Sequence, residues 1–87
     1  MIIGEPRNFQ FIKNLPSEFL MRVLNKQNET KKGIWYFVEI QEQKLNILSE
    51  SQLEEGNTFL VKKINNLTLK IIKDASPKNT NKIDIIL

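Results

Sequence analysis

The chain has 87 residues, a hydrophobic fraction of 40% and a formal net charge of +3, values that suit one small folded domain. It contains no histidine and no cysteine, so disulfides, thiolate nucleophiles, imidazole catalysis and the usual zinc and haem ligands are excluded. No apolar run approaches the length of a membrane span, and no secretory signal is recognisable at the amino terminus. We therefore expect a cytoplasmic protein without membrane insertion.

Short apolar stretches separated by polar turns predict β-strands in the first half of the chain. Residues 8–15 are expected to add an edge strand through Phe9, Phe11 or Ile12. A strand is expected over residues 19–24, and the strongest strand signal, dense in β-branched and aromatic side chains, covers residues 34–40. The polar stretch between these two strands predicts an exposed hairpin loop.

The same pattern continues after a short polar turn, where residues 44–49 predict a third strand. Ser49 is followed by Gln52 three positions later and by Gly56. A serine start, a glutamine at this spacing and a closing glycine are typical of one short helical turn. We therefore expect a helical turn between the third and fourth strands.

Residues 58–64 and 67–72 predict a closing hairpin around Asn65-Asn66, because asparagine tolerates the positive φ of tight turns. A two-residue turn would place Lys62 opposite Leu69, on the apolar face of the hairpin. Because a lysine is unfavourable there, we expect a bulge or a longer loop.

Together these elements predict an all-β fold, namely a small five-stranded antiparallel barrel of the oligonucleotide-binding (OB)-like type. Residues 1–87 are expected to form a single domain with a core over about 15–73. The ends, 1–14 and 74–87, are expected to be flexible or to depend on a partner. Whether residues 83–87 form a strand or a helix stays open.

The stretch Lys32–Val38 is the best candidate for nucleic-acid binding in the sequence. It is similar to the lysine-glycine-aromatic stretch of cold-shock and RNA-recognition domains, whose aromatic side chains stack on unpaired bases. In an extended strand Trp35 and Phe37 share one face and Tyr36 points to the other, so only one set can be exposed. The alternative is a central strand whose aromatic side chains fill the core.

Lysines gather on the expected closing hairpin, where they are candidates for contacts with nucleic-acid phosphates. The same charges would also give a solvated face that keeps an edge strand from pairing with another chain. These residues are Lys62, Lys63, Lys70 and Lys73.

The carboxylates do not predict catalysis. Glu39 and Glu42 flank a turn and Glu54 and Glu55 precede a glycine, but neither pair has a neighbour that would divide it into an acid and a base. No glycine-rich phosphate loop is present. We therefore expect no enzymatic activity, no cofactor and no metal.

Short motifs follow one another in a characteristic order between residues 20 and 73. They are Met21-Arg22-Val23, Trp35–Ile40, Leu45–Ser49, Leu53–Asn57, Val61 and Leu67–Ile71. The series resembles the barrel-like domain of flagellar hook-length control proteins, in which a Leu-x-x-Gly turn introduces a strand ending in Val and a Leu-x-Leu strand follows. This resemblance implies an OB-like barrel that works within a flagellar or secretion assembly.

The leading functional hypothesis is therefore a non-catalytic module that binds a protein partner through its surface or an unpaired strand edge. The alternative is a single-stranded nucleic-acid-binding domain that uses Trp35, Phe37 and the hairpin lysines. An exposed Trp35 beside Lys62 or Lys70 would favour nucleic acid. A buried Trp35 with an apolar patch or a free edge elsewhere would favour a protein. A homodimer formed by residues 83–87 is the third hypothesis.

Overall fold

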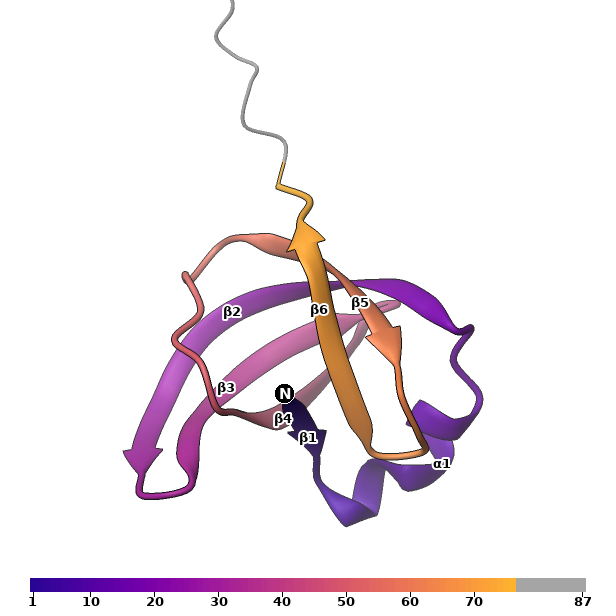
Figure 1. Cartoon of the computed structure of the whole chain (residues 1–87), viewed down its shortest axis with the longest axis horizontal. Helices are drawn as coiled ribbons and strands as arrows, with labels where there is room; N and C mark the ends of the chain where they lie inside the picture. Colours follow the sequence, from indigo (N-terminus) through magenta and orange to yellow (C-terminus); the bar gives the residue numbers. More distant parts are fainter. Residues whose placement is uncertain (77–87) are drawn as a thin grey trace, which may run out of the picture.

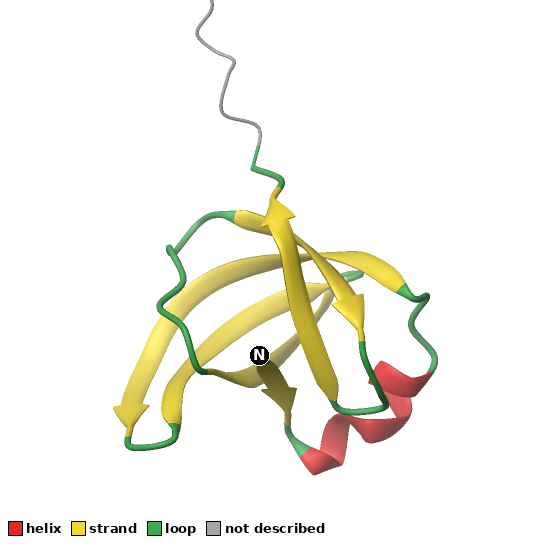
Figure 2. Cartoon of the chain, viewed as in Figure 1, coloured by secondary structure: helices red, strands yellow, loops and turns green. Residues whose placement is uncertain are grey.

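The computed structural model describes residues 1–76, which form a closed six-stranded antiparallel barrel with a short helical segment (Figures 1 and 2). The all-β barrel predicted from the sequence is confirmed, with six strands in place of five. The prediction for residues 83–87 lies outside the described part. The elements are β1 Ile2–Gly4, a 3-10 turn Pro6–Asn8, α1 Phe9–Lys13, β2 Glu18–Thr30, β3 Gly33–Ile40, β4 Gln43–Ser49, β5 Thr58–Lys63 and β6 Thr68–Asp74.

The strands follow the order β1-β4-β3-β2-β5-β6 around the barrel. The chain runs through β2, β3 and β4 as a meander, and β5 returns to pair with β2 on its other side. β1 closes the barrel by pairing with β4 on one side and with β6 on the other. Ile2, for example, pairs with Ser49 of β4 and with Leu69 of β6. Since β1 is antiparallel to both neighbours, β4 and β6 run in the same direction on either side of it.

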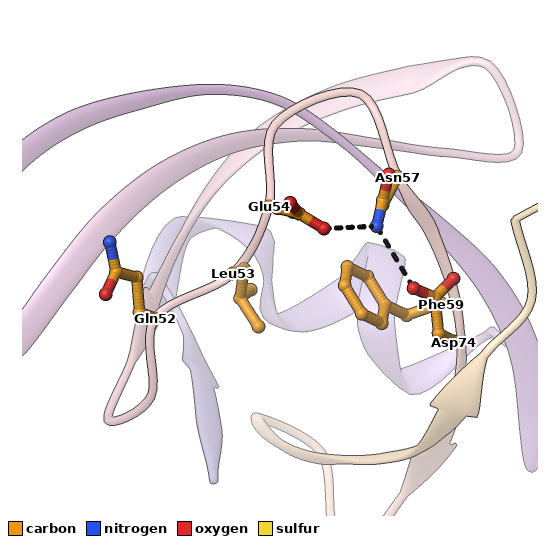
Figure 3. A pocket seen from close by; sticks show the side chains of 6 residues that line it. All are labelled: Gln52, Leu53, Glu54, Asn57, Phe59 and Asp74. Atoms are coloured by element: carbon orange, nitrogen blue, oxygen red, sulfur yellow. Dashed lines mark hydrogen bonds between the residues drawn. The ribbon is translucent and has the colours of Figure 1, made fainter.

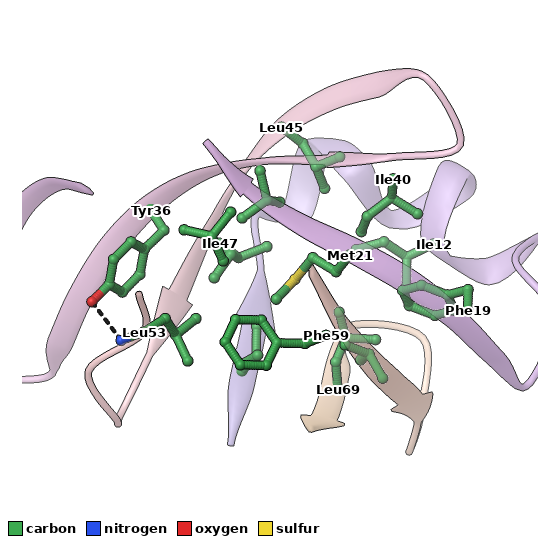
Figure 4. Packing of buried hydrophobic residues seen from close by; sticks show 14 of the residues in the cluster. Ile12, Phe19, Met21, Tyr36, Ile40, Leu45, Ile47, Leu53, Phe59 and Leu69 are labelled. Carbon is green, nitrogen blue, oxygen red and sulfur yellow. Dashed lines mark hydrogen bonds between the residues drawn. The ribbon is translucent and has the colours of Figure 1, made fainter. Parts of the chain in front are cut away.

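Alternating side chains along the strands build the core inside the barrel (Figure 4). The core begins at Ile2 and includes Ile12, so its expected start near residue 15 is too late. The buried hydrophobic residues are Ile2, Ile12, Leu15, Phe19, Met21, Val23, Ile34, Tyr36, Val38, Ile40, Leu45, Ile47, Leu53, Phe59, Val61 and Leu69.

One end of the barrel is closed by α1, where an edge strand was expected from residues 8–15. That prediction is wrong: Ile12 is fully buried and its side chain lies against Gly4, where an added Cβ would collide with it. Pro6 opens the 3-10 turn that leads into α1, a position where its missing N–H costs nothing. The conformation of this segment is thus determined by packing at the barrel end and not by its own residue pattern.

The opposite end is closed by the loop of residues 50–57, in which Leu53 points into the barrel (Figure 4). The backbone N–H of Leu53 donates a 2.8 Å hydrogen bond to the hydroxyl of Tyr36. The predicted helical turn does not form. Ser49 belongs to β4, and its hydroxyl is paired locally with the backbone N–H and C=O of Ser51, so it does not cap a helix.

The β2–β3 hairpin is longer than expected, because residues 25–30 continue β2 and only Lys31 and Lys32 form the turn. The prediction of a loop over the whole polar stretch is therefore wrong. Two register shifts interrupt this part of β2. Residues 25–30 of β2 extend past the part of the strand that pairs with β5, so the edge of β2 opposite β3 is open there. At this edge the backbone N–H of Lys26 donates a hydrogen bond to the carboxylate of Glu55.

The β5–β6 hairpin has the longer loop that the sequence analysis expected. The backbone N–H of Ile64 bonds to the carbonyl of Thr68, and the side chain of Asn65 accepts from the backbone N–H groups of Leu67 and Thr68. As a result Lys62 pairs with Lys70, and the apolar Leu69 pairs with Lys63. The shift of register moves Lys62 out of the apolar face.

Candidate functional site

Trp35 and Phe37 lie on the outer face of β3, and both are half-buried. Tyr36, between them in the sequence, is only 1% exposed inside the barrel. The predicted division of the aromatic side chains between two faces of β3 therefore holds. Tyr36 fills the core, and Trp35 and Phe37 belong to the surface.

Strand register places Trp35 in a continuous row of outward side chains that crosses five of the six strands of the barrel. Trp35 pairs with Leu48 on one side and with Asn28 on the other, and Leu48 pairs in turn with Ile3 of β1. Side chains of directly paired residues project on the same face of a sheet. The central row therefore reads Asn28, Trp35, Leu48, Ile3 and Thr68.

A second row next to the central one is also free of charge, since Phe37 pairs with Asn25 and with Asn46. The following row consists of charged residues, Arg22, Glu39 and Lys44. We call these two uncharged rows the uncharged face; because the central row crosses five of the six strands of the closed barrel, its ends at Asn28 and Thr68 curve away from the middle at Leu48. The uncharged face comprises Ile3, Asn25, Asn28, Trp35, Phe37, Asn46, Leu48 and Thr68.

The structure does not bring the candidate lysines to Trp35. Lys62 on β5 is separated from β3 by the whole of β2, and Lys70 and Lys73 lie on β6, three strands from β3 in either direction. Lys62, Lys70 and Lys73 are exposed, and Lys62 and Lys70 are directly paired across β5 and β6. The predicted site residues thus form two separate groups.

Lys63 has a local structural role at the end of α1. Its ammonium group donates to the backbone carbonyls of Leu15 at 2.6 Å, Lys13 at 2.8 Å and Ile12 at 3.4 Å. A cation at the carboxyl end of a helix satisfies carbonyls that have no partner within the helix. All three donors of the ammonium group are therefore directed at protein oxygens.

An open pocket of about 470 Å³ lies between the loop of residues 50–57 and the end of β6 (Figure 3). The buried side chains of Leu53 and Phe59 line it, and the side-chain amide of Asn57 donates to the carboxylates of Glu54 at 3.1 Å and Asp74 at 3.0 Å. These polar groups therefore tie the loop to β6. The lining residues are Gln52, Leu53, Glu54, Asn57, Phe59 and Asp74.

Over residues 1–76 no group of three or more acidic side chains is arranged to hold a metal ion. Within the same residues no helix is long and apolar enough to cross a membrane. Comparison with protein families, with curated proteins and with solved structures finds no match to this chain. The surface itself is therefore the basis for a functional proposal.

Ile3 and Leu48 belong to the candidate site but were not predicted from the sequence. Both are ordinary aliphatic residues, and they become neighbours of Trp35 only because β1 and β4 pair in this register. The one signal in the sequence was the alternation within residues 44–49, which assigns Leu48 to the face opposite Ile47.

Proposed function

We propose that this chain is a non-catalytic protein-interaction module that binds its partner through the uncharged face. The observation that carries the proposal is the central row, in which Ile3 is 43% exposed and lies beside the half-buried Leu48 and Trp35. Contiguous apolar side chains on a surface rimmed by polar groups are typical of protein-binding sites. The centre of such a site is typically rich in aromatic residues and poor in charged ones.

The charge distribution favours a protein over a nucleic acid at this face. Binding of single strands combines base stacking with cations that follow the phosphates, and the cations supply most of the affinity. None of the eight residues of the uncharged face carries a charge, and the exposed lysines of β5 and β6 lie away from Trp35: Lys70 is two residues along β6 from Thr68, at the end of the central row that is three strands from Trp35. An uncharged protein surface is the better complement.

The strand edges favour a face-to-face contact over addition of a strand. β1 closes the barrel, so the longest open edge in the described part is the end of β2. Two register shifts bend this edge, and the Glu55 carboxylate occupies the N–H of Lys26 that an incoming strand would use. Bulges and charged groups are the usual means of blocking edge pairing.

The resemblance to hook-length control proteins extends the proposal to the biological setting. It suggests that the partner belongs to a flagellar or secretion assembly. The support for this step is the series of short motifs between residues 20 and 73.

The test compares Ile3→Lys with Leu20→Lys in affinity purification from cells that produce the protein, with quantitative mass spectrometry. Leu20 is a matched control because it is also an exposed aliphatic residue on a strand, 55% exposed, but lies on β2 outside the uncharged face. Proteins recovered with the unmodified chain and with Leu20→Lys should be lost with Ile3→Lys. Equal recovery with all three would refute the proposal.

A second measurement tests the nucleic-acid alternative directly. Trp35 is the sole tryptophan of the chain, so its emission and anisotropy report on one place. A mixed single-stranded oligonucleotide should leave both signals unchanged at low and at moderate salt. Quenching that weakens as salt rises would show phosphate-dependent binding and would overturn the choice of partner.

A further inference from the structure

The positive charge of the chain is concentrated in the β5–β6 hairpin. Residues 58–74 contain four lysines and one aspartate, so their net charge of +3 equals that of the whole chain. The ammonium group of Lys63 is directed at the carbonyls at the end of α1. The other three, Lys62, Lys70 and Lys73, are exposed, and the proposed function makes no use of them.

Strand register gathers these three lysines on one side of two neighbouring strands (Figure 1). Lys62 is directly opposite Lys70, and in the next outward row Lys73 is opposite the half-buried Leu60. The register shift between the two rows gives β6 one extra residue, Ile72, which is 44% exposed. Because β5 and β6 are adjacent, these side chains form one continuous surface. We call it the basic face, and it comprises Leu60, Lys62, Lys70, Ile72 and Lys73.

The lysines of the basic face have no acidic partner in the described part of the chain. Within residues 1–76 none of the three forms an ion pair. Glu18 of β2 lies opposite Lys62, but the two side chains are not among the ion pairs of these residues. Like charges directly opposite each other destabilise a sheet. The pairing of Lys62 with Lys70 is therefore unfavourable for the fold, and an anionic group bound between the two ammonium groups would remove the repulsion.

We propose that the basic face binds an acidic segment of a partner protein, with carboxylates at the lysines and an apolar side chain against Leu60 and Ile72. Directly opposite residues of a sheet have Cβ atoms about 5 Å apart. Acidic residues one helical turn apart in a partner have nearly the same spacing, about 5–6 Å. The site goes beyond the proposed function, because the basic face shares no residue with the uncharged face.

The composition of the basic face favours a protein over the other anionic partners. Proteins that bind single-stranded nucleic acid combine cations with aromatic side chains on which the bases stack, and the basic face has no aromatic residue. An anionic membrane is nearly flat on this scale, whereas the outer surface of a closed barrel is convex, so few of the lysines would reach it together. A protein segment that lies along β5 and β6 meets both the lysines and the aliphatic side chains.

The test measures binding of a fluorescent peptide to the purified chain by anisotropy. In the peptide, glutamates four positions apart flank leucines; a second peptide has glutamine in place of every glutamate. The glutamate peptide should bind, and its affinity should fall as salt rises from about 0.01 to about 0.15 M, because the screening length shortens over this range. The glutamine peptide should not bind.

Two double variants locate the binding site while making the same change of net charge. Lys62→Gln with Lys70→Gln should weaken binding of the glutamate peptide about tenfold. Lys31→Gln with Lys32→Gln is the matched control, because these exposed lysines form the β2–β3 turn, outside the basic face. Since Lys62 and Lys70 repel each other, their replacement should not lower the urea unfolding midpoint, so a loss of binding is not a loss of fold. Ile72→Ser should weaken binding at both salt concentrations, because it removes apolar contact.

The outcomes decide both the site and the kind of partner. Equal binding by the two double variants, or equal binding of the two peptides, would overturn the basic face as a binding site. A single-stranded oligonucleotide, or vesicles of phosphatidylglycerol and phosphatidylcholine, that bind more tightly than the peptide and depend on Lys62 and Lys70 would overturn the choice of an acidic protein. Ile3→Lys should leave peptide binding unchanged, so failure of the uncharged face and failure of the basic face are distinguishable.

Discussion

Tyr36→Phe tests whether a single buried hydroxyl holds the loop that closes one end of the barrel. The substitution keeps the ring, which is 1% exposed, and removes only the acceptor of the 2.8 Å hydrogen bond from the Leu53 backbone N–H. A buried donor left without a partner costs about 1–3 kcal/mol, because it cannot recover its bond to water. For a domain of this size, each kcal/mol lowers the melting temperature by about 4–8 °C.

The assay is urea unfolding combined with hydrogen exchange of backbone amides. The unfolding midpoint should fall, and the Leu53 amide should lose its protection while amides within β3 and β4 change only as much as the global stability requires. Thr30→Val is the control, since the Thr30 hydroxyl bonds at the exposed hairpin turn and its loss should cost less than about 0.5 kcal/mol. An unchanged midpoint with a Leu53 amide still protected would refute this account of the loop.

Two further predictions concern stability and use paired variants in urea unfolding. Lys63→Met should cost about 1–2 kcal/mol, because three carbonyls at the end of α1 lose a charged donor, whereas Lys62→Met should be close to neutral; equal effects would contradict the capping role. Gly33→Ala should cost more than Gly56→Ala. Both glycines have positive φ, +150° and +87°, but a Cβ at Gly33 would collide with the backbone of Ser49, and a Cβ at Gly56 would meet open space. A larger fall in the unfolding midpoint for Gly56→Ala than for Gly33→Ala would contradict this prediction.

Most strands of the barrel, though not β1, were predictable because buried and exposed residues alternate along them. β3 buries every second residue from Ile34 to Ile40, and Phe19, Met21 and Val23 do the same in β2. The segments that differed from prediction are those whose conformation depends on distant contacts. In α1 the side chain of Ile12 fills the end of the barrel, and this tertiary contact cannot be recognised from residues 8–15 alone.

Short signals for caps were also ambiguous without the sheet. Ser49 and Gln52 have helix-start spacing, but the pairing of Ser49 with both Ile34 and Ile2 holds its backbone extended. The β1 strand has only three residues, too few for a period to be recognised. Its assignment requires knowing that β4 and β6 each offer an edge in the same place.

The candidate site was predictable only in part, for the same reason. Alternation places Trp35 and Phe37 on one face of β3, but it cannot say which side chains of other strands lie beside them. Ile3 and Leu48 lie in the same row as Trp35 because of the strand register. Because the β5–β6 loop is longer than two residues, Lys63 pairs with Leu69 and does not project on the same side as Lys62 and Lys70. Register is a property of the assembled sheet, set by packing on its buried face.

The position of β1 between β4 and β6 has a consequence for the order of events during synthesis. Ile2 lies in the first strand of the described barrel, but Leu69, one of its two partners, lies in the last strand. β1 can pair with β4 once Ser49 has been made, but its other edge stays unpaired until β6 is complete, and the loop closed by that last pairing spans nearly the whole described chain, with the entropy cost that such a length implies. The β1–β6 pairing that completes the barrel therefore forms only after the other five strands have been made, although β1 precedes all of them.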